Sequence, residues 1–90
     1  MNPKHKKLEK VLKALANARR LAIIRFLQDK KKASVGRIAE ELKLSFKATS
    51  KHLAILVAAE ILSKEQKSNY MLFEITTDLP EIARKLIALL

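Results

Sequence analysis

The chain contains no cysteine and only one glycine, Gly36, among its 90 residues. The absence of cysteine excludes disulfides, thiolate metal sites and thiol redox sensing, and a reducing cytoplasm is the simplest setting for such a chain. A single glycine also excludes the glycine-rich loops that hold phosphates in nucleotide-binding enzymes. No apolar run reaches the roughly eighteen residues that a membrane span needs, and the charged first ten residues do not resemble a signal peptide. We therefore expect one domain over residues 1–90 with no membrane partner.

Few residues could build a catalytic or metal site. The two histidines, His5 and His52, have no carboxylate or second histidine at a spacing that would complete such a site. Asp78 and Glu81 are explained more simply as acids at the positive end of a helix dipole. We therefore expect no enzymatic activity, no metal and no cofactor.

Acidic residues are scarce as well: nine of them stand against nineteen Lys and Arg, which gives a net charge of +10. The imbalance is concentrated in residues 1–32, which hold eleven basic and two acidic residues. A strongly basic chain favours an anionic partner, usually nucleic acid or a lipid surface. A lysine-rich composition with no specific partner would give the same charge, so the arrangement of the residues has to decide.

Apolar residues recur at helical spacing in four segments before residue 61. Polar residues suited to helix capping, Asn17, Ser34 and Ser45, precede three of these segments. The stretch "DKKKA" (29–33) interrupts the pattern and is predicted to be a loop. The first expected helix includes Leu8–Leu15, and the second runs from Ala18 to about Gln28. The third begins after Ser34. After a turn of three or four residues, the fourth runs from Ser45 to Ala58.

Beyond Ile61 the apolar residues follow the period of a strand. Met71, Phe73 and Ile75 alternate with their neighbours, and "ILSKEQK" before them indicates a weaker strand. Ser68–Asn69 fits the tip of the resulting hairpin, because asparagine tolerates the left-handed conformation found there.

A last helix is predicted to begin around Pro80. Asp78 is the expected N-cap, Pro80 lies in the first turn, and Glu81 is the expected acid of a capping box. The predicted fold class is mainly α with a β-hairpin, in the order α-α-α-α-β-β-α.

Two short helices joined by a tight turn are typical of a DNA-reading helix–turn–helix. On the second helix Lys47, Ser50, Lys51 and Ala54 form one stripe opposite the apolar stripe, and no carboxylate occurs from residue 47 to 58. A helix in the major groove needs short residues near the bases and cations toward the phosphates, and DNA would repel a carboxylate there. The stripe favours DNA binding, although short helices with two lysines are also common on ordinary protein surfaces.

Two further residues on this helix, Phe46 and His52, need an interpretation of their own. His52 is interpreted as a flank residue that touches a phosphate or a neighbouring side chain. Phe46 lies near the apolar stripe, so packing against the turn is its first interpretation and contact with a thymine methyl group is the alternative.

Three segments resemble the ArsR/SmtB winged-helix repressors: "LKALANARRLAIIRFL" (12–27), "SVGRIAEELKLSFKATSKHLAIL" (34–56) and the following "VAAEIL". The resemblance implies a winged helix–turn–helix fold, with a recognition helix from Ser45 to Ala58 and a wing at residues 61–76. It also implies a homodimer in which the first and last helices form the interface. Where the family usually has glycine, this chain has Lys43, Glu60 and Ser68–Asn69, and it lacks the cysteines and histidines of the metal-sensing members.

The residue pattern and the resemblance together give two sets of candidate site residues. The candidate DNA-binding residues are Ser45, Phe46, Lys47, Ala48, Ser50, Lys51, His52, Lys64, Lys67 and Asn69, with Lys30, Lys31 and Lys32 as further candidates for backbone contacts. The candidate dimer interface consists of Leu8, Val11, Leu12, Leu15, Leu79, Ile82, Leu86, Ile87 and Leu90. Two end helices with apolar stripes on so small a domain would independently favour a dimer.

The predicted function is that of a homodimeric transcriptional regulator, a repressor, which binds a palindromic operator in double-stranded DNA. One alternative is a winged-helix module for protein contacts, which would expose more aromatic anchors than this helix does. Another is a nonspecific nucleoid-type protein, which would bind with steep salt dependence and no sequence preference. No residue set points to a particular small-molecule effector.

Overall fold

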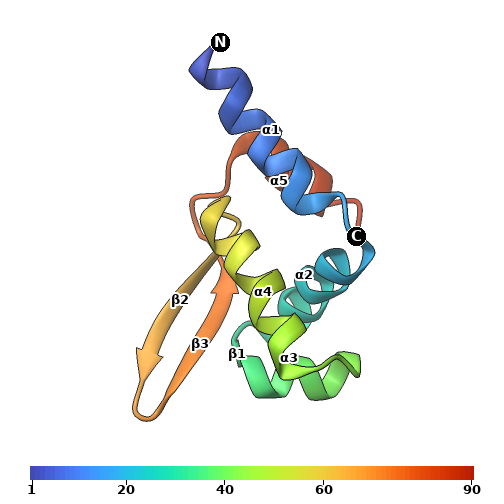
Figure 1. Cartoon of the computed structure of the whole chain (residues 1–90), viewed down its shortest axis with the longest axis vertical. Helices are drawn as coiled ribbons and strands as arrows, with labels where there is room; N and C mark the ends of the chain where they lie inside the picture. Colours follow the sequence, from blue (N-terminus) through green and yellow to red (C-terminus); the bar gives the residue numbers. More distant parts are fainter.

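The computed structural model describes all residues from 1 to 90 and contains five helices and a small antiparallel sheet (Figure 1). Its elements are α1 (Pro3–Leu15), α2 (Ala18–Lys30), β1 (Ala33–Ser34), α3 (Val35–Leu42), α4 (Phe46–Ala58), β2 (Leu62–Lys67), β3 (Tyr70–Ile75) and α5 (Glu81–Ile87). The predicted class, mainly helical with a hairpin between the fourth and fifth helices, is confirmed. The short strand β1 is an addition that the sequence pattern did not predict.

The three predicted caps begin their helices as expected. Asn17, Ser34 and Ser45 each occupy an N-cap position, where the side-chain oxygen accepts a hydrogen bond from the backbone N–H three residues later. Each such cap stabilises a helix by about 1 kcal/mol. The same device begins α1, where Asn2 accepts from the N–H of Lys4 at 2.8 Å.

The segment predicted as a loop at residues 29–33 is different in the structure. Asp29 and Lys30 continue α2, so the helix ends two residues later than expected. Lys31 then turns the chain with a φ of 72°, and the N–H of Lys32 bonds the carbonyl of Lys30 at 2.8 Å. Ala33 and the next residue pair with β3 as the third strand. A strand of two residues is too short to show a period, and only the pairing with β3 defines it.

The predicted start of the last helix is wrong in detail. Pro80, and not Asp78, occupies the N-cap position of α5, and no side chain caps this helix. Proline fixes φ near −65° and lacks an N–H, so a helix readily begins directly after it. Glu81 is consequently the first helical residue, one turn away from Lys85, with which it pairs at 3.4 Å.

The sheet has the order β1-β3-β2, and β2 and β3 form a long hairpin. At its tip Ser68 adopts the left-handed conformation with φ of 53°, and Asn69 does not. Lys43 and Glu60 have φ of 56° and 63°, so non-glycine residues are left-handed at positions where the resembled family usually has glycine. Each costs on the order of 1 kcal/mol relative to glycine.

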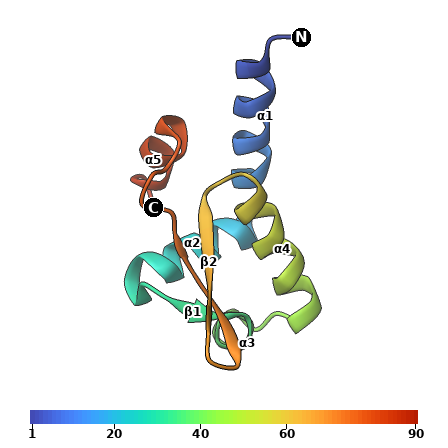
Figure 2. The ribbon, with the colours of Figure 1, turned by 90° about the vertical axis from the view of Figure 1, so that its left-hand side faces the viewer.

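The core lies between α2, α4 and the base of the hairpin. Ile23, Ile24 and Leu27 of α2 are fully buried, as are Leu53 and Leu56 of α4. The remaining helices pack around this centre, with α1 and α5 in contact at one end (Figures 1 and 2).

The first turns of α1 project away from the rest of the molecule (Figure 2). All of the first ten residues are exposed, and burial on α1 begins only at Val11. None of the five helices combines the length and the hydropathy that crossing a bilayer requires.

Candidate nucleic-acid interface

The helices α3 and α4 are joined by a turn of three residues whose backbone is held at both ends. Lys43, in the left-handed conformation, and the following Leu44 donate their N–H groups to carbonyls of the last turn of α3. Ser45 then caps α4, and the hydroxyl of the buried Thr49 donates to the carbonyl of Ser45 at 2.8 Å. The turn is therefore fixed by backbone geometry, which sets the direction in which α4 presents its outer face.

The outer face of α4 carries the stripe that the sequence pattern predicted. Lys47, Lys51 and Ala54 are exposed, and Ser50 is half-buried between them. The six ion pairs of the chain involve neither of these two lysines. Both cations are therefore free to bind an external anion, and no carboxylate on this helix opposes one.

Phe46 does not pack against the turn, so its first interpretation is wrong. Its side chain is 63% exposed. The helical wheel places the ring near the buried stripe, but a wheel gives only the direction of a side chain. At the first turn of α4 the neighbouring elements cover only part of this residue, and most of it remains on the surface beside Lys47.

His52 lies on the flank of α4, turned away from the stripe of Lys47 and Lys51 and toward α2. Its Nδ1 is 3.3 Å from Nη1 of Arg20. A guanidinium can only donate, so Nδ1 is the acceptor and the proton of the neutral ring is on Nε2. Burial, with the nearby positive charges of Arg20 and then Arg19, lowers the pKa of His52 below its usual 6.5. The structure thus places His52 in a contact between elements of the chain itself.

Arg20 is a residue that the analysis of the sequence did not single out. Its Nε donates to the carbonyl of Ala14 at 2.6 Å, and its Nη2 donates to the carbonyl of Lys13 at 2.9 Å. It therefore caps the carboxyl end of α1 while it holds His52 on α4. The stretch "ANARRL" contains this arginine, but its partner lies 32 residues away, a separation that no local pattern reveals.

The hairpin places its two predicted lysines on opposite faces. Lys64 pairs across the strands with the buried Phe73 and lies on the face toward α4, whereas Lys67 pairs with Tyr70 and lies on the other face. Strand residues three apart always point to opposite sides, so the spacing alone could have shown this. Asn69 lies at the exposed tip beside Ser68.

Lys32, proposed as a backbone contact, is already paired within the chain. Its Nζ lies 3.5 Å from Glu65 and 3.6 Å from Glu74, on the same outer face of the hairpin as Lys67. These two carboxylates lower the local positive potential on that face. The face that carries Lys64 is therefore the more favourable side of the hairpin for an anion.

The apolar residues proposed for the dimer interface fall into three groups. Val11, Leu15 and Ile87 are buried in the core of the single chain, where a partner cannot reach them. Leu79, Ile82 and Leu86 are half-buried against the same core. Leu8, Leu12 and Leu90 are 42%, 43% and 41% exposed.

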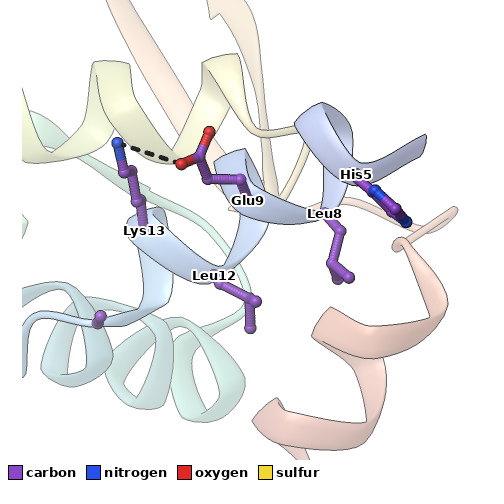
Figure 3. Close-up of a pocket in the computed structure, with 6 residues that line it drawn as sticks. His5, Leu8, Glu9, Leu12 and Lys13 are labelled. Carbon is purple, nitrogen blue, oxygen red and sulfur yellow. Dashed lines mark ion pairs between the residues drawn. The ribbon is translucent and has the colours of Figure 1, made fainter. Parts of the chain in front are cut away.

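The exposed leucines of α1 border an open hollow of about 350 Å³. Figure 3 shows Leu8 and Leu12 pointing from the same side of α1, with α5 next to them. Glu9 and Lys13 point to the other side, where they form an ion pair at 3.7 Å. His5, Glu9 and Lys13 also line the hollow, so the exposed leucines form an apolar patch that is bordered by polar side chains of the same helix.

No three side chains of His, Asp or Glu come close enough together to hold a metal ion. The sequence adds no cysteine to such a set. The exposed face of α4 and the hairpin therefore remain as the candidate site, and their chemistry is that of cation and hydroxyl donors.

Comparison with known proteins agrees with this geometry. The model of the family described as "Bacterial regulatory protein, arsR family" matches residues 17–64, from the cap of α2 into β2. A search of curated protein sequences gives no match.

Solved structures share the whole fold. HlyU from Vibrio cholerae is 30% identical with a TM-score of 0.80, and the match covers 99% of this chain and 92% of that one. The homodimeric winged helix–turn–helix DNA-binding domain Mb0332 from Mycobacterium bovis is 26% identical with a TM-score of 0.80, over 93% of this chain and 74% of that one. The transcriptional repressor PagR of Bacillus anthracis has the same fold, with 24% identity, a TM-score of 0.79 and coverage of 96% and 94%.

The family match spans more than half of the chain, and the winged helix–turn–helix architecture agrees with it over nearly the full length. This chain therefore belongs to the ArsR family of bacterial regulatory proteins, and it is a DNA-binding transcriptional regulator and not an enzyme.

Proposed function

We propose that the protein binds a specific sequence in double-stranded DNA, with α4 lying in the major groove. The observation that carries this proposal is the outer face of α4, where two unpaired lysines and small side chains occur without any carboxylate. A helix with such a face can approach base edges closely while its cations remain near phosphates.

The residues of this face would divide into two roles. Ala48, Ser50 and Lys51 are placed to approach base edges, which specify the sequence. Lys64, on the face of the hairpin toward α4, would bind the phosphate backbone, which contributes affinity without reading sequence.

We also propose that the protein acts as a homodimer through α1 and α5. Leu8, Leu12 and Leu90 expose an apolar surface that a second copy would cover isologously. The homodimeric state of the similar Mb0332 domain supports this arrangement. Two copies of α4 would then enter successive major grooves about 34 Å apart and read a palindrome.

Repression in the cytoplasm is the regulatory outcome that this arrangement favours. A dimer bound across two successive grooves occupies DNA that a polymerase would need, so binding within a promoter would block transcription. Transcription in vitro from a promoter that contains the selected operator would test the sign of the effect. A rise in transcript on adding the protein would contradict repression.

Selection of duplexes from a random DNA library, repeated at low and near-physiological salt, tests the whole proposal. A single palindromic motif with half-sites about one helical turn apart is the expected result. Binding that fades with salt and gives no motif would instead indicate a nonspecific nucleoid-type protein. A protein-interaction module would bind DNA weakly at both salt concentrations.

A further inference from the structure

The only glycine of the chain stands where the folded protein does not require it. Gly36 is the second residue of α3, it is exposed, and its φ is not positive. A Cβ atom built on it meets no other atom within 4 Å. Glycine is less favourable than alanine in a helix, because its backbone loses more conformational freedom on folding. Nothing inside the chain therefore explains why this position lacks a side chain.

Gly36 lines a hollow of about 350 Å³ where three elements meet. The lining residues are Ser34, Val35 and Gly36 at the start of α3, Phe46 of α4, and Asn69, Tyr70 and Met71 at the end of the wing. None of them carries a charge. A cavity of this size accepts a group about as large as one nucleotide unit, and the missing Cβ leaves the α3 backbone open on one side of it.

Two exposed aromatic residues are among those that line the hollow. Phe46 is 63% exposed and Tyr70 is 56% exposed, whereas the other two phenylalanines, Phe26 and Phe73, are buried. Large aromatic side chains are normally buried at least in part, and exposed ones that gather around a concavity mark an interface. Half of the aromatic residues of the chain are thus exposed around this one hollow.

We propose that this hollow receives one strand of the operator where the strand passes from the major groove to the wing. Phe46 directly precedes Lys47 on the recognition helix, so the hollow continues the face that binds DNA. In this arrangement the ring of Phe46 contacts a thymine methyl group. Gly36 lets the sugar–phosphate backbone come closer to α3 than any side chain would allow.

The inference rests on the proposed sequence-specific binding, but it makes a separate prediction. Gly36→Ala adds one methyl group that meets no atom of the protein. The variant should consequently be as stable as the wild type or more stable, with Tm raised by up to about 4 °C. The same methyl group would meet the DNA strand, so affinity for the selected operator should fall about tenfold. Stability and binding change in opposite directions only if something outside the chain fills the hollow.

A double-mutant cycle, in which Phe46 and one thymine of the DNA are changed separately and together, tests the role of Phe46. Each thymine of the half-site is replaced in turn by deoxyuridine, which removes only the methyl group, and affinity is measured for wild type and Phe46→Ala. At one position the wild type should lose about fivefold to tenfold in affinity, and Phe46→Ala should lose nothing further there. Phe46→Leu, which keeps an apolar side chain, serves as the matched control and should retain part of the discrimination.

The outcomes separate this inference from the proposed function. If the wild type selects a palindrome but Gly36→Ala binds it with unchanged affinity, the hollow does not hold DNA and the inference is overturned. The same holds if no thymine couples to Phe46. If the wild type selects no sequence at all, the proposed function fails first, and a Gly36→Ala variant with unchanged nonspecific binding would overturn the inference as well.

Discussion

Helices α1 and α4 have the same length of thirteen residues, and each buries one apolar stripe, yet their outer faces differ. The outer face of α1 combines lysines with the exposed leucines Leu8 and Leu12 and with Glu9. The outer face of α4 carries two lysines with small residues between them and no acid, and α4 also exposes Phe46 and Ile55. The helix with more positive charge therefore has the surface of a helix that packs on a partner, and the helix with less charge has the surface of one that reads DNA.

The positions of the two helices support the same distinction. The start of α1 lies at one end of the molecule, whereas α3 and the tip of the wing lie at the other (Figures 1 and 2). Lysines on the first turns of α1 can raise the rate of encounter with DNA through their long-range field. Net charge thus indicates an anionic partner, but the absence of carboxylates and the size of the side chains locate the contact.

The largest expected effect comes from changing α1. The double substitution Leu8→Lys and Leu12→Lys would place four charges in the proposed symmetric dimer interface, because each change occurs in both copies. We expect the dimer dissociation constant to rise more than a hundredfold, since each leucine contributes about 1.5–3 kcal/mol when buried. Sedimentation velocity measures the change, and affinity for the full palindrome should fall with it.

Ile55→Lys is the matched control for this experiment. Ile55 is an aliphatic residue on α4 with the same exposure, 43%, as Leu12. It should leave the dimer intact. If Ile55→Lys dissociates the dimer as strongly as the α1 changes do, α1 is not the specific interface.

Lys51→Ala on α4 is expected to weaken binding to the selected operator by about 1–3 kcal/mol and to relax the sequence preference at one position. Lys6→Ala removes another exposed lysine without an ion pair, this one from α1. This control should change affinity only slightly and equally for all sequences. Affinity for the operator is measured by titration with labelled duplexes. If both variants lose the same affinity, α4 contributes no more to DNA binding than α1 does.

The hairpin offers a finer comparison of two cations on one element. Lys64→Gln should reduce the slope of log affinity against log salt by about 1, because a phosphate contact is lost. Lys67→Gln should reduce the slope less, since Lys67 lies on the opposite face together with Glu65 and Glu74. The reverse order would show that the outer face of the wing is the one against DNA.

The smallest expected effect concerns Arg20 of α2, which links the end of α1 to His52 of α4. Because the pKa of His52 is lowered in the folded chain, the unfolded chain takes up the proton first as pH falls. Stability should therefore be complete above about pH 6.5 and decline as the pH falls below that value. Urea unfolding of wild type between pH 7.5 and 5 measures this decline.

His52→Asn is the control for the pH dependence. The asparagine oxygen can replace Nδ1 as the acceptor for Arg20, but it does not titrate. The part of the pH dependence that comes from His52 should disappear, while stability at pH 7.5 changes little. An unchanged pH profile would assign the acid sensitivity to other groups.

Much of the fold could be predicted because it depends on residues close in sequence. The caps Asn17, Ser34 and Ser45 bond to N–H groups three residues away, and the stripe on α4 repeats every three or four residues. The start of α5 was misplaced at Asp78, because Asp78 and Pro80, two residues apart, both carry signals for a helix start. The strand β1 could not be predicted, because two residues become a strand only when β3 lies beside them.

The sequence by itself determined the order of the five helices and the hairpin, the helix–turn–helix and the face of α4 that is free of acids. These features follow from hydrogen bonds between residues close in sequence and from the period of the apolar residues. Both depend on the local sequence and not on which distant elements pack together. Tertiary structure alone decided that Phe46 is exposed, that Val11 is buried while Leu8 is not, and that Arg20 holds His52 across 32 residues. Burial and such pairings depend on which distant element covers a side chain, and the position of that element is fixed only when the whole core has formed.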